Sequence, residues 1–217
     1  MIVIWGGGNT QQLASSSTPV YVYNGVITDE KAIDFTNDNI SEAFGYLAND
    51  EKHYIFDNET DLLTWAGTLD AANRDKLVNL IQDRQALRAI AVSTNAQAYA
   101  ETHKEEPPQD FIDQTKAYLQ NKYGQTASVR SYGYVWDNCP AWGASFPQGP
   151  GTVSWYPKYI RNKMSGVQEI GILGTVFFTR PFYFGGAWYF NPIYHVFGVC
   201  LENHWFNNNQ VSSIGGF

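Results

Sequence analysis

The chain changes character near residue 130, and this change constrains its fold more than any single motif. Residues 1–130 carry 18 acidic and 10 basic side chains, whereas residues 131–217 carry 3 acidic and 4 basic ones. Aromatic residues follow the opposite trend, since 21 of the 34 lie within residues 131–217. We therefore expect a conventional, charged part that contains helices, followed by an aromatic-rich part with little charge.

A proline-containing break divides the chain at residues 105–108, before the change in composition. The 217 residues are enough for one large domain or two small ones. Glu105-Glu-Pro-Pro108 interrupts the helical pattern around it and is the best-marked boundary. The sequence therefore predicts a mixed α/β region over residues 1–108 and an aromatic-rich α+β domain over residues 109–217.

Residues 1–108 contain two clear local signals. Asn24-Gly25, the preferred pair for a two-residue turn, lies between β-forming residues and predicts a hairpin over 20–28. Asp70 is a suitable N-cap for a helix over 70–91, whose apolar residues form one stripe. That stripe comprises Leu77, Leu80, Ile81 and Leu87. We also expect a short helix over 41–48 and a strand over 53–56.

Residues 109–217 predict one helix and then short strands. Asp110 to Tyr123 has helical periodicity and is followed by Gly124, a typical helix stop. The β-like runs that follow are 175–178, 188–190, 195–201 and 211–214. The expected fold class is α+β, with a helical N-terminal part followed by a small antiparallel sheet packed on helices.

Composition and motif spacing exclude several kinds of partner. The chain has no large cluster of Lys and Arg to neutralise phosphates, so we expect no nucleic-acid binding. The most apolar window, 170–190, is broken by Gly, Arg and Pro, so we expect no membrane span. The first eight residues lack the basic and apolar regions of a signal peptide. The Cys and His residues show no metal-ligand spacing, so neither metal nor cofactor is expected.

A cysteine and a histidine near the C-terminus form a candidate catalytic pair. Asn138-Cys139-Pro140 is typical of a helix start, where the helix dipole lowers the pKa of a thiol and favours the thiolate. His195 opens a predicted strand and is the candidate general base. Cys200 lies between Val199 and Leu201 and is expected in the core.

The order of these segments resembles that of papain-like cysteine amidases and peptidases of the CHAP and NlpC/P60 type. Cys139 is followed by Trp142, then by the Gly-Thr-Val-Phe-Phe run of 174–178 and the Tyr-His-Val-Phe-Gly-Val run of 194–199. The resemblance covers roughly residues 110–217. It implies a papain-like or NlpC-like fold in which Cys139 is the nucleophile and His195 is the base.

The resemblance also implies a third polar residue and a substrate. Ser213 or its neighbour Ser212 lies on the last predicted strand, where related enzymes orient the histidine, and Glu202 and Asn203 are alternatives. The implied reaction is cleavage of a peptidoglycan amide bond through an acyl-enzyme. Peptidoglycan or a cell-surface glycan would be the partner. The expected substrate-binding residues are Trp142, Trp188, Tyr194 and Trp205.

A non-enzymatic function is the alternative, as a virion, tail or capsid component or as a homo-oligomer. Eight of the fourteen residues from Phe177 to Phe190 are aromatic, and such a charge-poor patch suits either a substrate groove or a subunit interface. Ile2 to Trp5, followed by three glycines, is suited to strand addition onto a neighbour. The Trp- and Asn-rich run 203–209 also allows a carbohydrate-binding module. These readings predict a protein that is virion-associated or delivered outside the producing cell.

Overall fold

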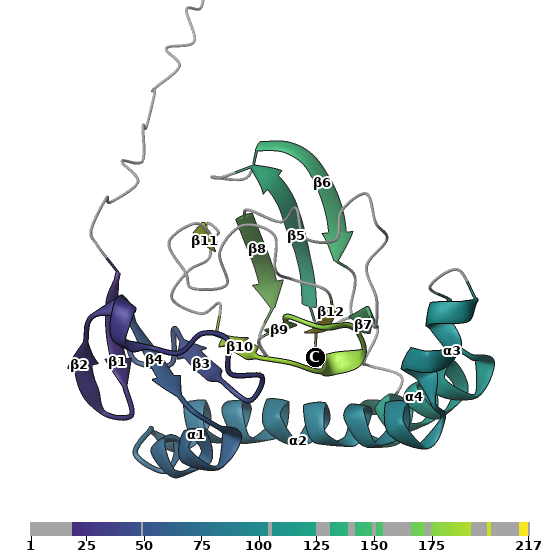
Figure 1. Cartoon of the computed structure of the whole chain (residues 1–217), viewed down its shortest axis with the longest axis horizontal. Coiled ribbons are helices and arrows are strands. Elements are labelled where there is room, and N and C mark those ends of the chain that lie inside the picture. The colour runs from purple at the N-terminus through teal and green to yellow at the C-terminus, as the bar shows by residue number, and fades with distance from the viewer. Residues whose placement is uncertain are drawn as a thin grey trace, which may run out of the picture.

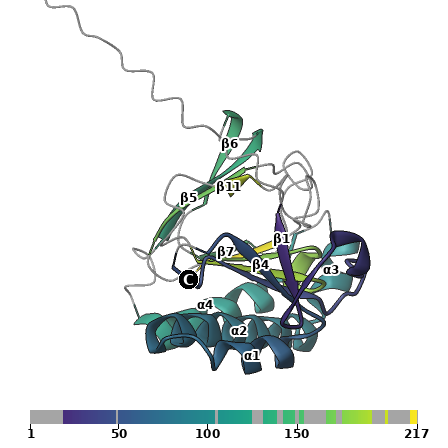
Figure 2. The ribbon, with the colours of Figure 1, turned by 90° about the vertical axis from the view of Figure 1, so that its left-hand side faces the viewer.

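The computed structural model describes the following parts of the chain. Backbone and side chains are described for residues 19–48, 50–103, 106–124 and 176–191, and the backbone alone for 131–138, 142–148, 151–153, 166–171, 175, 199–200 and 213–216. These residues form three layers, with helices on one side, an eight-stranded sheet in the middle and a four-stranded sheet on the other side (Figure 1, and from the side in Figure 2). The expected α+β class is confirmed.

The helical layer is formed from residues 59–123. Its helices are α1 (Glu59–Ala66), α2 (Ala71–Ser93), α3 (Ala96–Thr102) and α4 (Gln109–Tyr123). Asp70 caps α2, because its side chain accepts a hydrogen bond from the Asn73 N–H, as the sequence predicted. Short 3₁₀ turns, η1 (Glu30–Ala32) and η3 (Pro181–Tyr183), occur elsewhere in the chain.

The large sheet has the strand order β2-β1-β4-β3-β10-β9-β12-β7. Its strands are β1 (Val20–Tyr23), β2 (Val26–Thr28), β3 (Ser41–Phe44), β4 (Lys52–Phe56), β7 (Gly151–Val153), β9 (Thr175–Phe178), β10 (Ala187–Phe190) and β12 (Ser213–Gly216). The pairs β1–β4 and β3–β10 are parallel and the other pairs are antiparallel. Because β3 pairs with β10, strands from both sides of residue 108 belong to one sheet.

The second sheet is antiparallel and has the order β11-β8-β5-β6. Its strands are β5 (Ser131–Asn138), β6 (Trp142–Gln148), β8 (Gly166–Gly171) and β11 (Val199–Cys200). The sequence predicted one small antiparallel sheet from the runs 175–178, 188–190, 195–201 and 211–214. Three of these runs contribute β9, β10 and β12 to the large mixed sheet, and only β11 belongs to the small one.

The two faces of the large sheet are buried in different ways. The face toward the helices packs against α1 and α2 through an apolar cluster that includes Ala43, Val176, Phe178, Leu77 and Leu80. The other face points toward the side of the four-stranded sheet (Figure 2). Its buried residues, as the register places them, are Tyr21, Glu42, Phe44, His53, Ile55, Phe177, Trp188 and Phe190.

Two expected helices are strands in the structure. The helix expected over 41–48 is wrong, because Ser41–Phe44 is β3, which is buried on both faces between β4 and β10. The short helix expected to start at Cys139 is also wrong, because Trp142–Gln148 is β6 and Trp142 pairs with Asn138. In Ser41–Phe44 the pairing with the distant strand β10 overrides the local preference, whereas β6 forms a hairpin with β5, the strand that precedes it.

Candidate functional site

The residues predicted for catalysis lie largely beyond what the structure describes. Cys139, Tyr194, His195 and Trp205 are outside the described residues. Trp142 is the first residue of β6 in the four-stranded sheet, whereas Ser213 is the first residue of β12 in the large sheet, and only their backbones are described. The structure therefore does not bring these predicted site residues together or separate them.

The aromatic run 177–190 forms core and not an exposed surface. Trp188 is 0 % exposed, and its ring stacks on Phe177 with the centroids 5.0 Å apart. Phe182 and Tyr183 pack on the helical side, where Phe111 of α4 meets the Phe182 ring edge-on at 5.3 Å. Trp188 therefore has no surface to offer a substrate groove or a second subunit, and its ring stabilises the fold instead.

A buried Glu–His contact joins two adjacent strands of the large sheet beside this aromatic core. Glu42 of β3 and His53 of β4 are almost fully buried, and His53 Nδ1 lies 2.6 Å from Glu42 Oε1. The rings of Tyr21 and Phe44 flank the imidazole, with centroids 5.2 and 4.9 Å away. In catalytic triads a carboxylate bound to an imidazole orients the histidine toward a nucleophile. With neither group exposed to solvent, the pair is suited to holding strands together.

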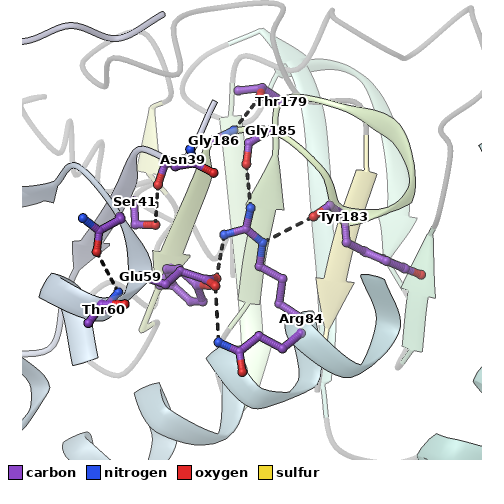
Figure 3. A network of polar contacts seen from close by, with 12 residues as sticks. Asn39, Ser41, Glu59, Thr60, Arg84, Thr179, Tyr183, Gly185 and Gly186 are labelled. Atoms are coloured by element: carbon purple, nitrogen blue, oxygen red, sulfur yellow. Dashed lines mark hydrogen bonds and ion pairs between the residues drawn. The ribbon is translucent and has the colours of Figure 1, made fainter. Parts of the chain in front are cut away.

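A second buried network joins α1, α2 and the β9–β10 loop (Figure 3). Arg84 is 2 % exposed and donates from Nη1 to Glu59 Oε1 at 2.6 Å. It also donates from Nε to the Tyr183 carbonyl at 3.3 Å and from Nη2 to the Gly185 carbonyl at 2.6 Å. The Tyr189 hydroxyl donates to the same Glu59 oxygen. Each of the three guanidinium nitrogens therefore donates a hydrogen bond.

The electrostatics of this network favour a fixed, charged arginine. Burial opposes the charge on Arg84, but Tyr189 and Glu59 outweigh it and raise the pKa of Arg84. For Tyr189 burial disfavours the phenolate and raises the pKa, so its hydroxyl stays protonated and acts as a donor. The Arg84 network therefore acts as a structural clamp on the β9–β10 loop, in which Phe182 and Tyr183 have φ of 56° and 69°.

The open edge of the large sheet is the described feature that is best suited to binding. Strand β2 ends the sheet, with β1 as its neighbour and no described strand on its other side (Figure 1). Two adjacent large apolar residues of this strand are exposed: Val26 is 66 % exposed and Ile27 is 71 % exposed. Exposed apolar residues on an edge strand are what a pairing partner would cover.

The hairpin that carries this edge is firmly held. Asn24 and Gly25 have φ of 47° and 85°, as a two-residue hairpin turn requires. The Tyr23 hydroxyl and the Asn24 amide, the latter at 2.9 Å, both donate to the Asp57 carboxylate just after β4. The hydrogen bond to Asp57 raises the pKa of Tyr23 to about 12. The edge is therefore a preorganised surface, because its turn is tied to the body of the sheet.

Two kinds of site are not seen in the described residues. No group of three or more His, Cys, Asp or Glu side chains is placed there to hold a metal ion. None of the helices α1 to α4 is both long and apolar enough to cross a membrane.

Comparisons with known proteins give no family. No family model matches the chain, and no curated protein does so. A solved βγ-crystallin from an archaeon is similar to part of it, with 17 % identity and a TM-score of 0.35, over 41 % of this chain and 99 % of that one. A likeness this low carries no inference about fold or function.

Sequence reasoning found the hairpin and missed what makes it a candidate site. The Asn-Gly turn predicts both strands, but the open side of β2 depends on β1 pairing with β4, a contact between distant segments. The Glu42–His53 pair was also missed. No local pattern signals it, since Glu42 follows Ser41 and His53 follows Lys52, as polar residues at the start of many strands do.

Proposed function

We propose that this protein is a non-enzymatic interaction component that docks an extended segment of its partner against the β2 edge. The observation that carries the proposal is the exposure of Val26 and Ile27 on a preorganised edge strand. Assembly components of virions, tails or capsids belong to this functional class. The partner would add a strand to the eight-stranded sheet.

The geometry of the hairpin supports strand addition. A two-residue turn closes on a hydrogen-bonded pair, here Tyr23 and Val26, so hydrogen bonding alternates along β2 from that point. Ile27 is the next residue, and its N–H and C=O therefore point away from β1. Val26 and Ile27 project on opposite faces because successive side chains in a strand alternate. A partner segment would gain main-chain hydrogen bonds and apolar contacts on both faces.

The edge also lacks some of the features that block pairing. Proteins protect edge strands with proline, lysine or inward-pointing charges. Strand β2 is short, which limits accidental pairing, but its three residues Val-Ile-Thr include neither proline nor charge. The first charged side chains after it are those of Asp29 and Glu30. A short extended segment would cover the three residues of this edge.

The cysteine hydrolase function stays a prediction from the resemblance. Its expected helix start at Cys139 is absent, since the following residues form β6, and this removes the helix-dipole argument for a thiolate. Trp188, an expected substrate contact, is buried in the core. No described residue supplies a new argument for catalysis, so the docking function is the stronger proposal.

A photo-crosslinking amino acid at position 27 tests the docking proposal in the producing cell. We expect a discrete cross-linked product whose partner residues fall on one extended segment, because an added strand runs alongside Ile27. The matched control is the same substitution at Val92 of α2, which is 67 % exposed but lies on a helix. Products at both positions, or partner residues scattered over a surface, would rule out docking by strand addition.

A further inference from the structure

We propose that residues Ile2–Trp5 of the same chain add to the open side of β2 and so act as a built-in competitor for the docking edge. This inference rests on the proposed docking function and names how that site is regulated. Four kinds of observation support it: the chemistry of the segment, the chemistry of the edge, the length of the tether and the point at which the described chain begins.

The segment and the edge are complementary. Val26 and Ile27 expose apolar surface on both faces of the sheet, so a partner strand must also be apolar on both faces. Ile2-Val3-Ile4-Trp5 has four apolar, β-favouring residues in succession and no charge. It therefore offers an apolar side chain to each face whichever register it adopts.

The tether places this segment within reach of the edge. The described chain begins at Pro19, immediately before β1, and β1 is the neighbour of β2. A strand added beyond β2 would lie two strand spacings from β1, or about 10 Å. The 14 residues from Gly6 to Pro19 are rich in Gly, Ser and Thr. A flexible tether of this length has a root-mean-square span of about 20 Å, so it is long enough.

Addition within one chain is favoured over exchange between two copies. A short flexible tether gives its segment an effective concentration in the millimolar range at a nearby site. A second copy at ordinary protein concentrations cannot compete with that value. Gly6-Gly7-Gly8 directly follows the segment and lets the chain turn back without steric cost. A docking partner must then displace residues 2–5, which sets a threshold for binding.

The test compares full-length variants of the protein. Ile2→Glu with Ile4→Glu places two charges in the segment, and Gln11→Glu with Gln12→Glu places the same two charges in the tether as the control. We expect the Ile27 amide hydrogen to exchange at least 10-fold faster in the segment variant than in the wild type or the tether variant. Equal exchange in all three proteins would overturn the proposal.

A synthetic peptide probe separates this inference from the docking function. The probe is residues 1–8 followed by a short lysine tail. We expect it to bind the segment variant at least 10-fold more tightly than the wild type, whose edge is already occupied. Equal affinity, or no binding to either protein, would contradict the proposal. The cross-linking experiment at position 27 is repeated in the segment variant, and cross-links to the docking partner are counted. Partner cross-links that are equally abundant in the wild type and the segment variant would refute the competitor while leaving the docking function intact.

Light scattering tests whether the edge is instead occupied by residues 2–5 of a second copy of the chain. We expect the wild type to be monomeric across a concentration series, because the segment binds within its own chain. A dimer that becomes monomeric in the segment variant would show exchange between copies and would overturn addition within one chain.

Discussion

Replacing Arg84 by methionine is expected to lower the free energy of unfolding by about 3–5 kcal/mol. The guanidinium is 2 % exposed and joins Glu59 to the carbonyls of Tyr183 and Gly185 (Figure 3). Methionine fills similar volume but leaves the Glu59 carboxylate partly buried without its cation. The β9–β10 loop also loses the donor that holds two of its carbonyls. Urea unfolding followed by circular dichroism measures the change.

Two further variants show whether the effect comes from the buried network. Arg74 lies on the same helix, pairs with Asp75 at 3.2 Å and is well exposed, so Arg74→Met is expected to change stability by less than about 0.5 kcal/mol. Arg84→Met combined with Glu59→Gln is expected to recover part of the loss, because no uncompensated carboxylate remains. A loss below about 1 kcal/mol for Arg84→Met would mean that the clamp contributes little.

Removing either member of the Glu42–His53 pair is expected to cost about 3–5 kcal/mol. His53→Ala leaves the Glu42 carboxyl group buried without the imidazole that lies 2.6 Å away, and it opens space between Tyr21 and Phe44. The double variant Glu42→Leu with His53→Phe is expected to be more stable than His53→Ala or Glu42→Leu, because it leaves neither polar group buried without its partner and refills the aromatic site. Chemical denaturation of the three variants and the wild type gives the values.

An exposed histidine provides the control for this pair. His103, at the C-terminus of α3, is exposed and can be replaced by alanine with an expected change below about 0.5 kcal/mol. If the double variant were less stable than either single variant, the pair would be doing more than joining β3 to β4. In that case the apolar replacement argument would fail at this site.

Local sequence signals predicted those elements whose formation depends on nearby residues. The turn at Asn24-Gly25 and the Asp70 cap belong to this group, because turn geometry and capping involve residues only a few positions apart. The β3 segment Ser41–Phe44 does not, since its strand state comes from pairing with β4 and with β10, nearly 150 residues away. A helix-favouring Glu-Ala pair there outweighed a contact that no local pattern reveals.

The same limit explains the candidate site. Val26 and Ile27 are ordinary strand residues by composition, and they form an exposed edge only because β1 uses its other side to pair with β4. Trp188 was expected at a surface because the run around it is too aromatic for one buried face. The sheet buries both faces of β10, one against helices and one on the side of the second sheet, so the run fits in the core.

The reactivity of Cys139 toward iodoacetamide between pH 5 and 9, in the wild type beside His195→Ala, tests most directly whether this chain works by docking or by catalysis. A non-enzymatic docking protein predicts slow alkylation at pH 6, a rise near about 8.5 as for an ordinary thiol, and no effect of the substitution. Peptide mapping distinguishes Cys139 from Cys200. Rapid alkylation of Cys139 at pH 6 that disappears in His195→Ala would show a thiolate–imidazole pair and would contradict the non-enzymatic function.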